Sequence, residues 1–242
     1  MSDEVTTHRY GGLPDQVADL RVPTGDGPHP VAMIIHGGFW RARYTREIME
    51  GLACDLSLAG WATWNVEYRR VGAGGGVPQT LDDVLAAHDA VATLRAPLDV
   101  RRIAVLGHSA GGHLAFWLAS RRRLQLAVSL AGVVCLAEAA RQRLGDGAVS
   151  AFCGGGPEDV PRVYERADPS AHLPLGVPQL VVHGDADDVV PVEMSRTWAE
   201  RAATTGDACE LMVLRGVGHF ELIDPRAPAW ASVRARLPRA AA

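Results

Sequence analysis

Ser109 is the residue of this chain best placed for nucleophilic chemistry, because it lies in segment 107–112, with sequence GHSAGG. The apolar run 102–106 precedes this segment, and a run with helical character follows it. A strand that turns sharply through Gly-x-Ser-x-Gly into a helix forms a nucleophile elbow, which presents the serine hydroxyl at the end of a sheet. Gly107 and Gly111 have no β-carbon, so the strand and the helix can approach closely. The alternative interpretation is a glycine-rich turn whose serine has no chemical role.

A serine nucleophile needs a base, and the base needs a carboxylate that orients it. Where the serine sits on an elbow, the order along the chain is serine, acid, histidine. The turn 183–191, with sequence HGDADDVVP, lies downstream of Ser109, and His219 is the one histidine after it. We therefore expect His219 to be the general base. Three aspartates of the turn are candidates for the acid, and their spacing leaves the choice open: Asp185, Asp187 and Asp188.

Segment 36–40, with sequence HGGFW, follows an early apolar run and is suited to binding a substrate oxygen. Glycine pairs allow backbone N–H groups to face such an oxygen, and this position supplies the second donor of the oxyanion hole in elbow enzymes. We expect the N–H of Phe39, or alternatively that of Gly38, to act together with the N–H of Ala110. Phe39 and Trp40 are candidates for lining a substrate pocket, and core packing is the alternative for both.

Other residues near these motifs have structural interpretations. We expect His108 to be structural and His113 to be a packing or surface residue of the helix after the elbow. Segment 67–69, with sequence EYR, is expected to be a buried anchor of its loop. The long segment 131–175 separates two predicted core strands, and such an excursion is often functional. It is a candidate for a small cap or a substrate-lining wall, and within it Phe152 is a candidate for substrate contact.

The composition is typical of a globular protein without a nucleic-acid partner. The chain has 242 residues, a length sufficient for one large α/β domain. Of these residues 48% are hydrophobic and 21% are charged, as in ordinary globular proteins. The formal net charge of -4 does not favour binding to nucleic acid or to an anionic membrane. No apolar run approaches ~20 residues, and Met1 to Tyr10 lack the apolar region of a secretory signal, so we expect neither a membrane span nor a leader peptide.

Cysteine and histidine spacing predicts neither disulfides nor a metal site. The scattered residues Cys54, Cys135, Cys153 and Cys209 form no zinc-binding pattern, and four reduced thiols are typical of a cytoplasmic protein. The chain contains no His-Glu-x-x-His pattern, and we expect no metal and no cofactor. Oligomeric state is left open by the sequence.

The predicted elements alternate between strands and helices, which indicates a mainly parallel sheet covered on both faces. Segments 5–10 and 17–22 are predicted to pair as an antiparallel hairpin at its edge. We expect Thr80 to cap a helix, with Asp83 completing a capping box. The other predicted strands are 31–35, 61–66, 102–106, 126–130, 178–183 and 208–214; the other predicted helices are 45–59, 110–120, 136–144, 160–167, 193–203 and one containing Trp230.

Together these motifs resemble the α/β-hydrolase family, and the esterase branch that includes kynurenine formamidase (arylformamidase) and small carboxylesterases. The resemblance covers nearly the whole chain through segments 36–40, 107–112 and 183–191 and through His219. It implies an α/β-hydrolase fold in one domain, 1–242, and an acyl-enzyme mechanism without a cofactor. The acid of the H-G-x-x-D-x-x-V-P turn in that branch aligns with Asp187. The absence of a large cap disfavours long-chain lipids as substrates.

Three functional hypotheses follow. The first is a serine esterase for a small substrate, aromatic esters included. The second keeps the same groups but cleaves an aryl formamide, as an arylformamidase does. The third is a ligand-binding protein that has the fold without the catalysis, since a fold does not fix a function.

Overall fold

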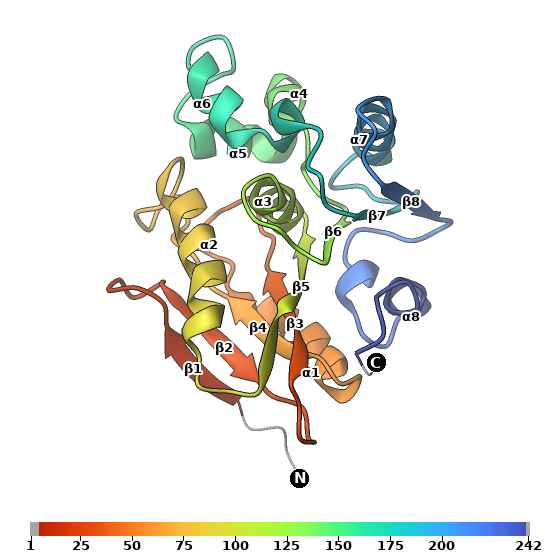
Figure 1. Cartoon of the computed structure of the whole chain (residues 1–242). Coiled ribbons are helices and arrows are strands. Elements are labelled where there is room, and N and C mark those ends of the chain that lie inside the picture. Colours follow the sequence, from red (N-terminus) through yellow and green to blue (C-terminus); the bar gives the residue numbers. More distant parts are fainter. Residues whose placement is uncertain (1–4, 241–242) are drawn as a thin grey trace.

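An eight-stranded sheet runs through the computed structural model, which describes residues 5–240 (Figure 1). The strand order is β1-β2-β4-β3-β5-β6-β7-β8. β1 pairs with β2 and β2 with β4 in antiparallel fashion, and all other neighbours are parallel. The strands are β1 Val5–Arg9, β2 Val17–Arg21, β3 His29–Ile35, β4 Ala62–Val66, β5 Leu98–His108, β6 Leu126–Leu130, β7 Gln179–Gly184 and β8 Cys209–Leu214. The first four residues, where we expect no leader peptide, lie outside the described part.

Helices cover both faces of this sheet (Figure 1). α2, α3 and α7 contribute Val84, Leu114 and Trp198 to one hydrophobic core, whereas α1 and α8 contribute Leu52 and Trp230 to the other. The helices are α1 Glu50–Leu58, α2 Gln79–Ala90, α3 Ala110–Ala119, α4 Leu136–Arg141, α5 Leu144–Cys153, α6 Pro161–Ala167, α7 Val192–Thr204 and α8 Pro228–Arg234; the short 3₁₀ helices are η1 Arg46–Met49, η2 Val91–Thr93, η3 Pro169–His172 and η4 Glu221–Ile223.

Burial on both faces explains why the central strands are continuous apolar runs. Every residue of β4, β6 and β7 is buried, as is β3 after His29. The expected mainly parallel sheet with an antiparallel N-terminal edge is confirmed. Because the parallel strands end at one edge of the sheet, the segments that follow β3, β5 and β7 meet there.

Two local expectations about helices were wrong. Thr80 lies inside α2, whose N-cap is Pro78. Its hydroxyl instead donates to the carbonyl oxygen of Arg69 (2.6 Å) and accepts from the N–H of Gly76 (3.0 Å), which fastens the preceding glycine-rich loop. Asp83 is not part of a capping box, because its carboxylate binds the Arg69 guanidinium.

The predicted helix 45–59 begins as the 3₁₀ helix η1 and continues as α1. Its first turn is tied to the end of β4 from two sides. The N–H of Arg46 donates to Oε2 of Glu67 (3.0 Å), and the side-chain amide of Asn65 donates to the carbonyl oxygen of Arg46 (3.0 Å).

The excursion 131–175 folds into α4, α5 and α6, which lie beside α3 (Figure 1). Two side chains of α3 fix it there: Nε2 of His113 donates to the carbonyl oxygen of Ala167 and Nε1 of Trp117 to that of Arg166, both at 2.9 Å. Within residues 5–240 no helix has the length and hydropathy needed to cross a membrane.

Candidate active site

The predicted elbow is present at the junction of β5 and α3. Ser109 adopts φ 56° and ψ -117°, a strained conformation for a residue with a side chain. Its N–H donates to the carbonyl oxygen of Leu130 (2.9 Å), which fixes the bend against β6. A β-carbon on Gly107 would collide with the backbone of Gly111, and one on Gly111 would collide with the carbonyl of Ile35. Both glycines therefore meet the steric requirement deduced from the sequence.

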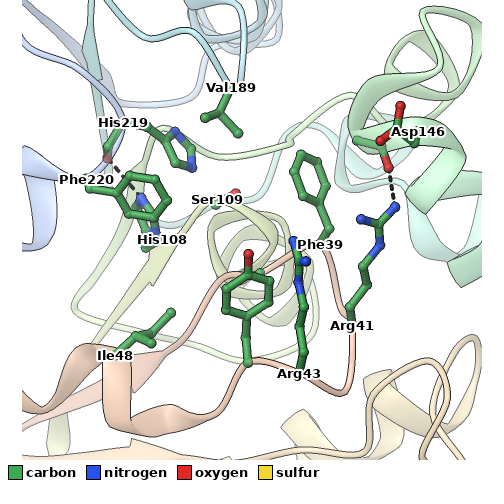
Figure 2. Close-up of a pocket in the computed structure, with 13 residues that line it drawn as sticks. Phe39, Arg41, Arg43, Ile48, His108, Ser109, Asp146, Val189, His219 and Phe220 are labelled. Carbon is green, nitrogen blue, oxygen red and sulfur yellow. Dashed lines mark hydrogen bonds between the residues drawn. The ribbon is translucent and has the colours of Figure 1, made fainter.

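The candidate acid and the candidate base are in direct contact. Nδ1 of His219 lies 2.7 Å from Oδ2 of Asp187, and both side chains are buried. The other carboxylate oxygen of Asp187 accepts the N–H groups of Val189 and Val190, each at 2.8 Å. Because Asp187 accepts the proton on Nδ1 of His219, Nε2 is the ring nitrogen left for Ser109. Ser109 and His219 line the same cavity (Figure 2).

The electrostatic surroundings keep Asp187 ionised. Burial raises the pKa of this carboxyl, but hydrogen bonds from His183 and His219 and from the Val190 N–H outweigh it, so the pKa lies well below its usual range. A carboxylate that stays ionised is suited to stabilise an imidazolium at His219.

The other two aspartates of the turn do not reach His219. Oδ1 of Asp185 accepts the N–H of Gly216 (2.6 Å) and so ties the turn to the loop after β8. Asp188 is exposed. Of the three candidates, Asp187 is therefore the one in contact with the imidazole.

Segment 36–40 forms a tight loop next to the elbow. Gly38, Phe39 and Trp40 all have positive φ, and the carbonyl of Gly38 accepts the N–H of Arg41 (3.0 Å). Within residues 5–240 no protein acceptor takes a hydrogen bond from the N–H of Phe39, Gly38 or Ala110. These groups remain available to a substrate oxygen, as an oxyanion hole requires.

Buried polar contacts hold this loop in place. His36 and Glu67 form a 2.9 Å contact through Nε2 and Oε1, and the ring of Tyr68 stacks on His36 with centroids 4.3 Å apart. The Tyr68 hydroxyl donates to the carbonyl oxygen of His36 (2.9 Å). Segment 67–69 thus anchors its loop through two buried residues, as expected.

A cavity of about 340 Å³ opens over Ser109 (Figure 2). Its size falls within the range of small-molecule sites. It is lined by Gly38, Phe39, Arg41, Arg43, Tyr44, Ile48, His108, Ser109, Gly145, Asp146, Val189, His219 and Phe220. Gly145 and Asp146 come from the excursion 131–175, so that segment forms part of the wall.

The pocket expectation must be corrected for two aromatic residues. Trp40 and Phe152 are fully buried and stack on each other with centroids 4.5 Å apart, so they belong to the core rather than to the cavity wall. Phe39 is half-buried and does line the cavity. The left-handed turn at positions 39 and 40 explains this difference, because it sends neighbouring side chains in different directions.

His108 is a structural residue, as expected, whereas sequence reasoning missed the contact of His183 with Asp187. His108 lines the cavity, and its Nε2 donates to the carbonyl oxygen of His219 (3.1 Å), which holds the loop that carries His219. Burial and the nearby His219 lower the pKa of His108 to about 3, so it is neutral at pH 7. His183 lies against Asp187, and its position at the end of a strand directly before the acidic turn was the available signal.

Within the described chain no group of His, Cys, Asp and Glu is arranged to hold a metal ion.

Comparison with known proteins places the chain in a family. A family model described as the prolyl oligopeptidase family matches residues 60–235, which is more than half of the sequence. The chain belongs to the prolyl oligopeptidase family. The match begins ahead of β4 and includes the elbow, the acidic turn and His219.

Individual relatives are esterases by name. Esterase LipC of Mycobacterium tuberculosis is 29% identical over an alignment 258 residues long, gaps included, which covers 89% of this chain and 59% of that protein. The solved structure of esterase B from Lactobacillus rhamnosis matches with a TM-score of 0.81 at 17% identity, over 96% of this chain and 84% of that one. A carbohydrate esterase from gut microbiota matches with a TM-score of 0.82 at 19% identity, over 97% and 96% of the two chains. These structural likenesses confirm the α/β-hydrolase fold.

Proposed function

We propose that the protein is a serine hydrolase that cleaves a carboxylic ester of a small substrate through an acyl-enzyme intermediate. The observation that carries this proposal is the 2.7 Å contact between Asp187 and His219 at the cavity that Ser109 lines. Nucleophile, acid and base come from the segments after β5, β7 and β8, respectively, and they follow the chain order of elbow hydrolases.

In the proposed reaction, Nε2 of His219 takes the proton of Ser109 as the hydroxyl oxygen attacks the ester carbonyl carbon. The N–H groups of Phe39 and Ala110, with Gly38 as the alternative to Phe39, stabilise the negative oxygen of the tetrahedral intermediate. His219 then protonates the departing alcohol. Water, activated by the same imidazole, hydrolyses the acyl-enzyme and regenerates Ser109.

Named relatives support ester cleavage as the reaction type. LipC is named an esterase, and esterase B has been solved with a tributyrin phosphonate inhibitor. Thermogutta terrifontis esterase 2, which matches with a TM-score of 0.76 at 21% identity, has been solved phosphoramylated by tabun. This chain spans 59% of LipC, so the activity named for the longer protein is carried over here as a proposal.

Hydrolysis of an aryl formamide is the second candidate. The same nucleophile and base serve an amide, and the rings of Phe39 and Phe220 line the cavity where an aromatic substrate would lie. The family description also makes a prolyl peptide bond a substrate to include in any screen.

We further propose that the chain is one hydrolase domain in which segment 131–175 supplies one wall of the substrate site. Gly145 and Asp146 carry that role. The four unpaired cysteines fit a reducing compartment, and we place the protein in the cytoplasm on that basis.

The test of the proposed function compares the wild-type protein with Ser109→Ala. A fluorophosphonate probe should label the wild-type protein at Ser109 and leave the variant unlabelled. Turnover should then be measured with p-nitrophenyl acetate, aromatic and methyl esters, N-formylkynurenine and a prolyl peptide, with the variant as the blank. Fast ester cleavage beside negligible formamide cleavage would remove the second candidate. An unlabelled Ser109 in folded wild-type protein would leave only a ligand-binding function.

A further inference from the structure

Two arginines face the cavity at Ser109, and ester hydrolysis as such requires neither. Arg41 and Arg43 leave the same loop, directly after the oxyanion segment; Arg43 extends toward Phe39, and Arg41 extends toward Asp146 (Figure 2). An arginine guanidinium is always charged and presents a planar fork of donors that matches a carboxylate.

Arg41 is held in a defined position. Its Nη2 donates to the carbonyl oxygen of Gly145, and its guanidinium carbon lies 5.8 Å from the centroid of the Phe39 ring. The backbone at Gly145, Asp146 and Gly147 is left-handed, which turns this part of α5 toward the cavity. Arg41 therefore joins the oxyanion loop to the excursion, and its charge lies at the cavity wall.

Arg43 is exposed, and its charge is unpaired. Its guanidinium carbon lies 4.6 Å from the centroid of the Tyr44 ring, and no carboxylate within residues 5–240 forms an ion pair with it or with Arg41. The next arginine in the chain differs, because Arg46 binds Asp19 at 2.6 Å. A flat guanidinium beside an aromatic ring is positioned to donate in one plane.

The charges at the cavity wall favour an anion. Among the residues that line it, Asp146 is the one carboxylate, against the two guanidinium groups. The opposite part of the wall is apolar, with Ile48, Val189 and Phe220, and Phe220 is 60% exposed. The cavity thus offers an apolar region and a cationic region on either side of Ser109 (Figure 2).

We propose that the substrate is an ester that bears a carboxylate close to the scissile bond, and that Arg43 binds this carboxylate with Arg41 beside it. The remaining, apolar part of the substrate then packs on Ile48, Val189 and Phe220. This inference rests on the proposed hydrolase function and specifies its substrate class. Asp146 opposes the binding of the carboxylate and limits the strength of the preference.

A matched pair of substrates tests the inference. 4-Acetoxybenzoate and 4-acetoxybenzamide share the acetyl group and the ring and differ in the charge of the para substituent. The quantity to measure is the ratio of kcat/KM for the acid to that for the amide. Because the ratio is compared between variants, the different reactivities of the two leaving groups cancel.

We expect Arg43→Gln to lower this ratio by about tenfold, the effect of a charge-assisted contact that is partly screened by solvent. Arg43→Lys should give a ratio between those of the wild-type protein and Arg43→Gln, since lysine keeps the charge but lacks the planar fork of donors. Asp146→Asn should raise the ratio. Arg101→Gln, whose side chain is 91% exposed on β5, is the matched control and should leave it at the wild-type value. An Arg43→Gln ratio equal to the wild-type ratio would overturn the inference.

Binding separates this inference from the hydrolase proposal. Titration of Ser109→Ala with 4-hydroxybenzoate and 4-hydroxybenzamide, followed by NMR, needs no turnover. Tighter binding of the acid, lost when Arg43→Gln is added, supports the anion site even if no ester is cleaved. Equal binding of both compounds, together with ester cleavage by the wild-type protein, would remove the anion site and leave the hydrolase.

Discussion

Nε2 of His183 lies 3.2 Å from Oδ2 of Asp187, the same carboxylate oxygen that contacts His219. The nitrogen also donates to the carbonyl oxygen of Val190 (2.9 Å), and the hydroxyl of Ser195 donates to the other ring nitrogen (2.7 Å). A buried chain of contacts thus runs from α7 through His183 and Asp187 to His219. In the proposed reaction His183 is a positioning residue, since it contacts the site through Asp187.

We therefore expect His183→Phe to lower kcat by roughly 10- to 100-fold, the range seen when a supporting hydrogen bond in a site is lost. The pKa of the Asp187 carboxyl, followed by NMR, should rise, because the carboxylate loses a donor that keeps this pKa low. His183→Gln keeps an N–H donor and should recover part of the rate. A purely structural role would lower the melting temperature while leaving the pKa of Asp187 in place.

Asp187→Asn should cost far more activity than Asp188→Asn. Only the first removes the carboxylate that contacts Nδ1 of His219, and such a change in a hydrolase triad costs about 10⁴-fold in kcat. Asp188 is exposed, and the Asp188→Asn substitution should change kcat by less than about threefold. Steady-state kinetics on one ester measures both, and a larger loss in Asp188→Asn would reassign the acid.

His113 should make the folded state sensitive to mild acid. Burial lowers its pKa to about 4, below the ordinary value of 6.5, so the unfolded chain binds more protons between these two values. Stability from this group is therefore complete above about pH 6.5 and is lost as pH falls toward 4. From pH 7 to pH 5 it should remove about 1 to 2 kcal/mol from the free energy of unfolding.

The matched variant is His113→Gln, whose amide can still donate to the carbonyl of Ala167 but does not titrate. Urea unfolding at the two pH values should show a smaller decrease for the variant than for the wild-type protein. Equal decreases would mean that other groups account for the acid sensitivity.

Gly107→Ala should destabilise the fold by more than about 3 kcal/mol, because its β-carbon would collide with the backbone of Gly111, which cannot move as a side chain can. Gly12→Ala is the control, since a β-carbon there meets nothing within 4 Å, and its effect should stay within about 0.5 kcal/mol. Thermal unfolding measures both variants. If the two midpoints coincide, the elbow does not depend on close contact between strand and helix.

The sequence was sufficient for the order of the strands and for the choice of candidate site residues, but not for helix α5, which it did not predict. The strands β3 and β6 and the elbow at Ser109 can be recognised from short stretches of sequence. Burial in the sheet requires consecutive apolar residues, and the bend at the elbow requires glycines close to the serine. The chain order of serine, acid and histidine then predicts His219 as the base.

Only the tertiary structure determined which of several nearby side chains reach the site. Asp185, Asp187 and Asp188 have similar sequence surroundings, and the contact with His219 depends on how two separate loops approach each other. Trp40 belongs to the core and Arg43 to the cavity wall, and the sequence around them does not distinguish these two environments. Residue types and spacing report local geometry, whereas contacts between distant segments depend on the packed arrangement of the whole chain.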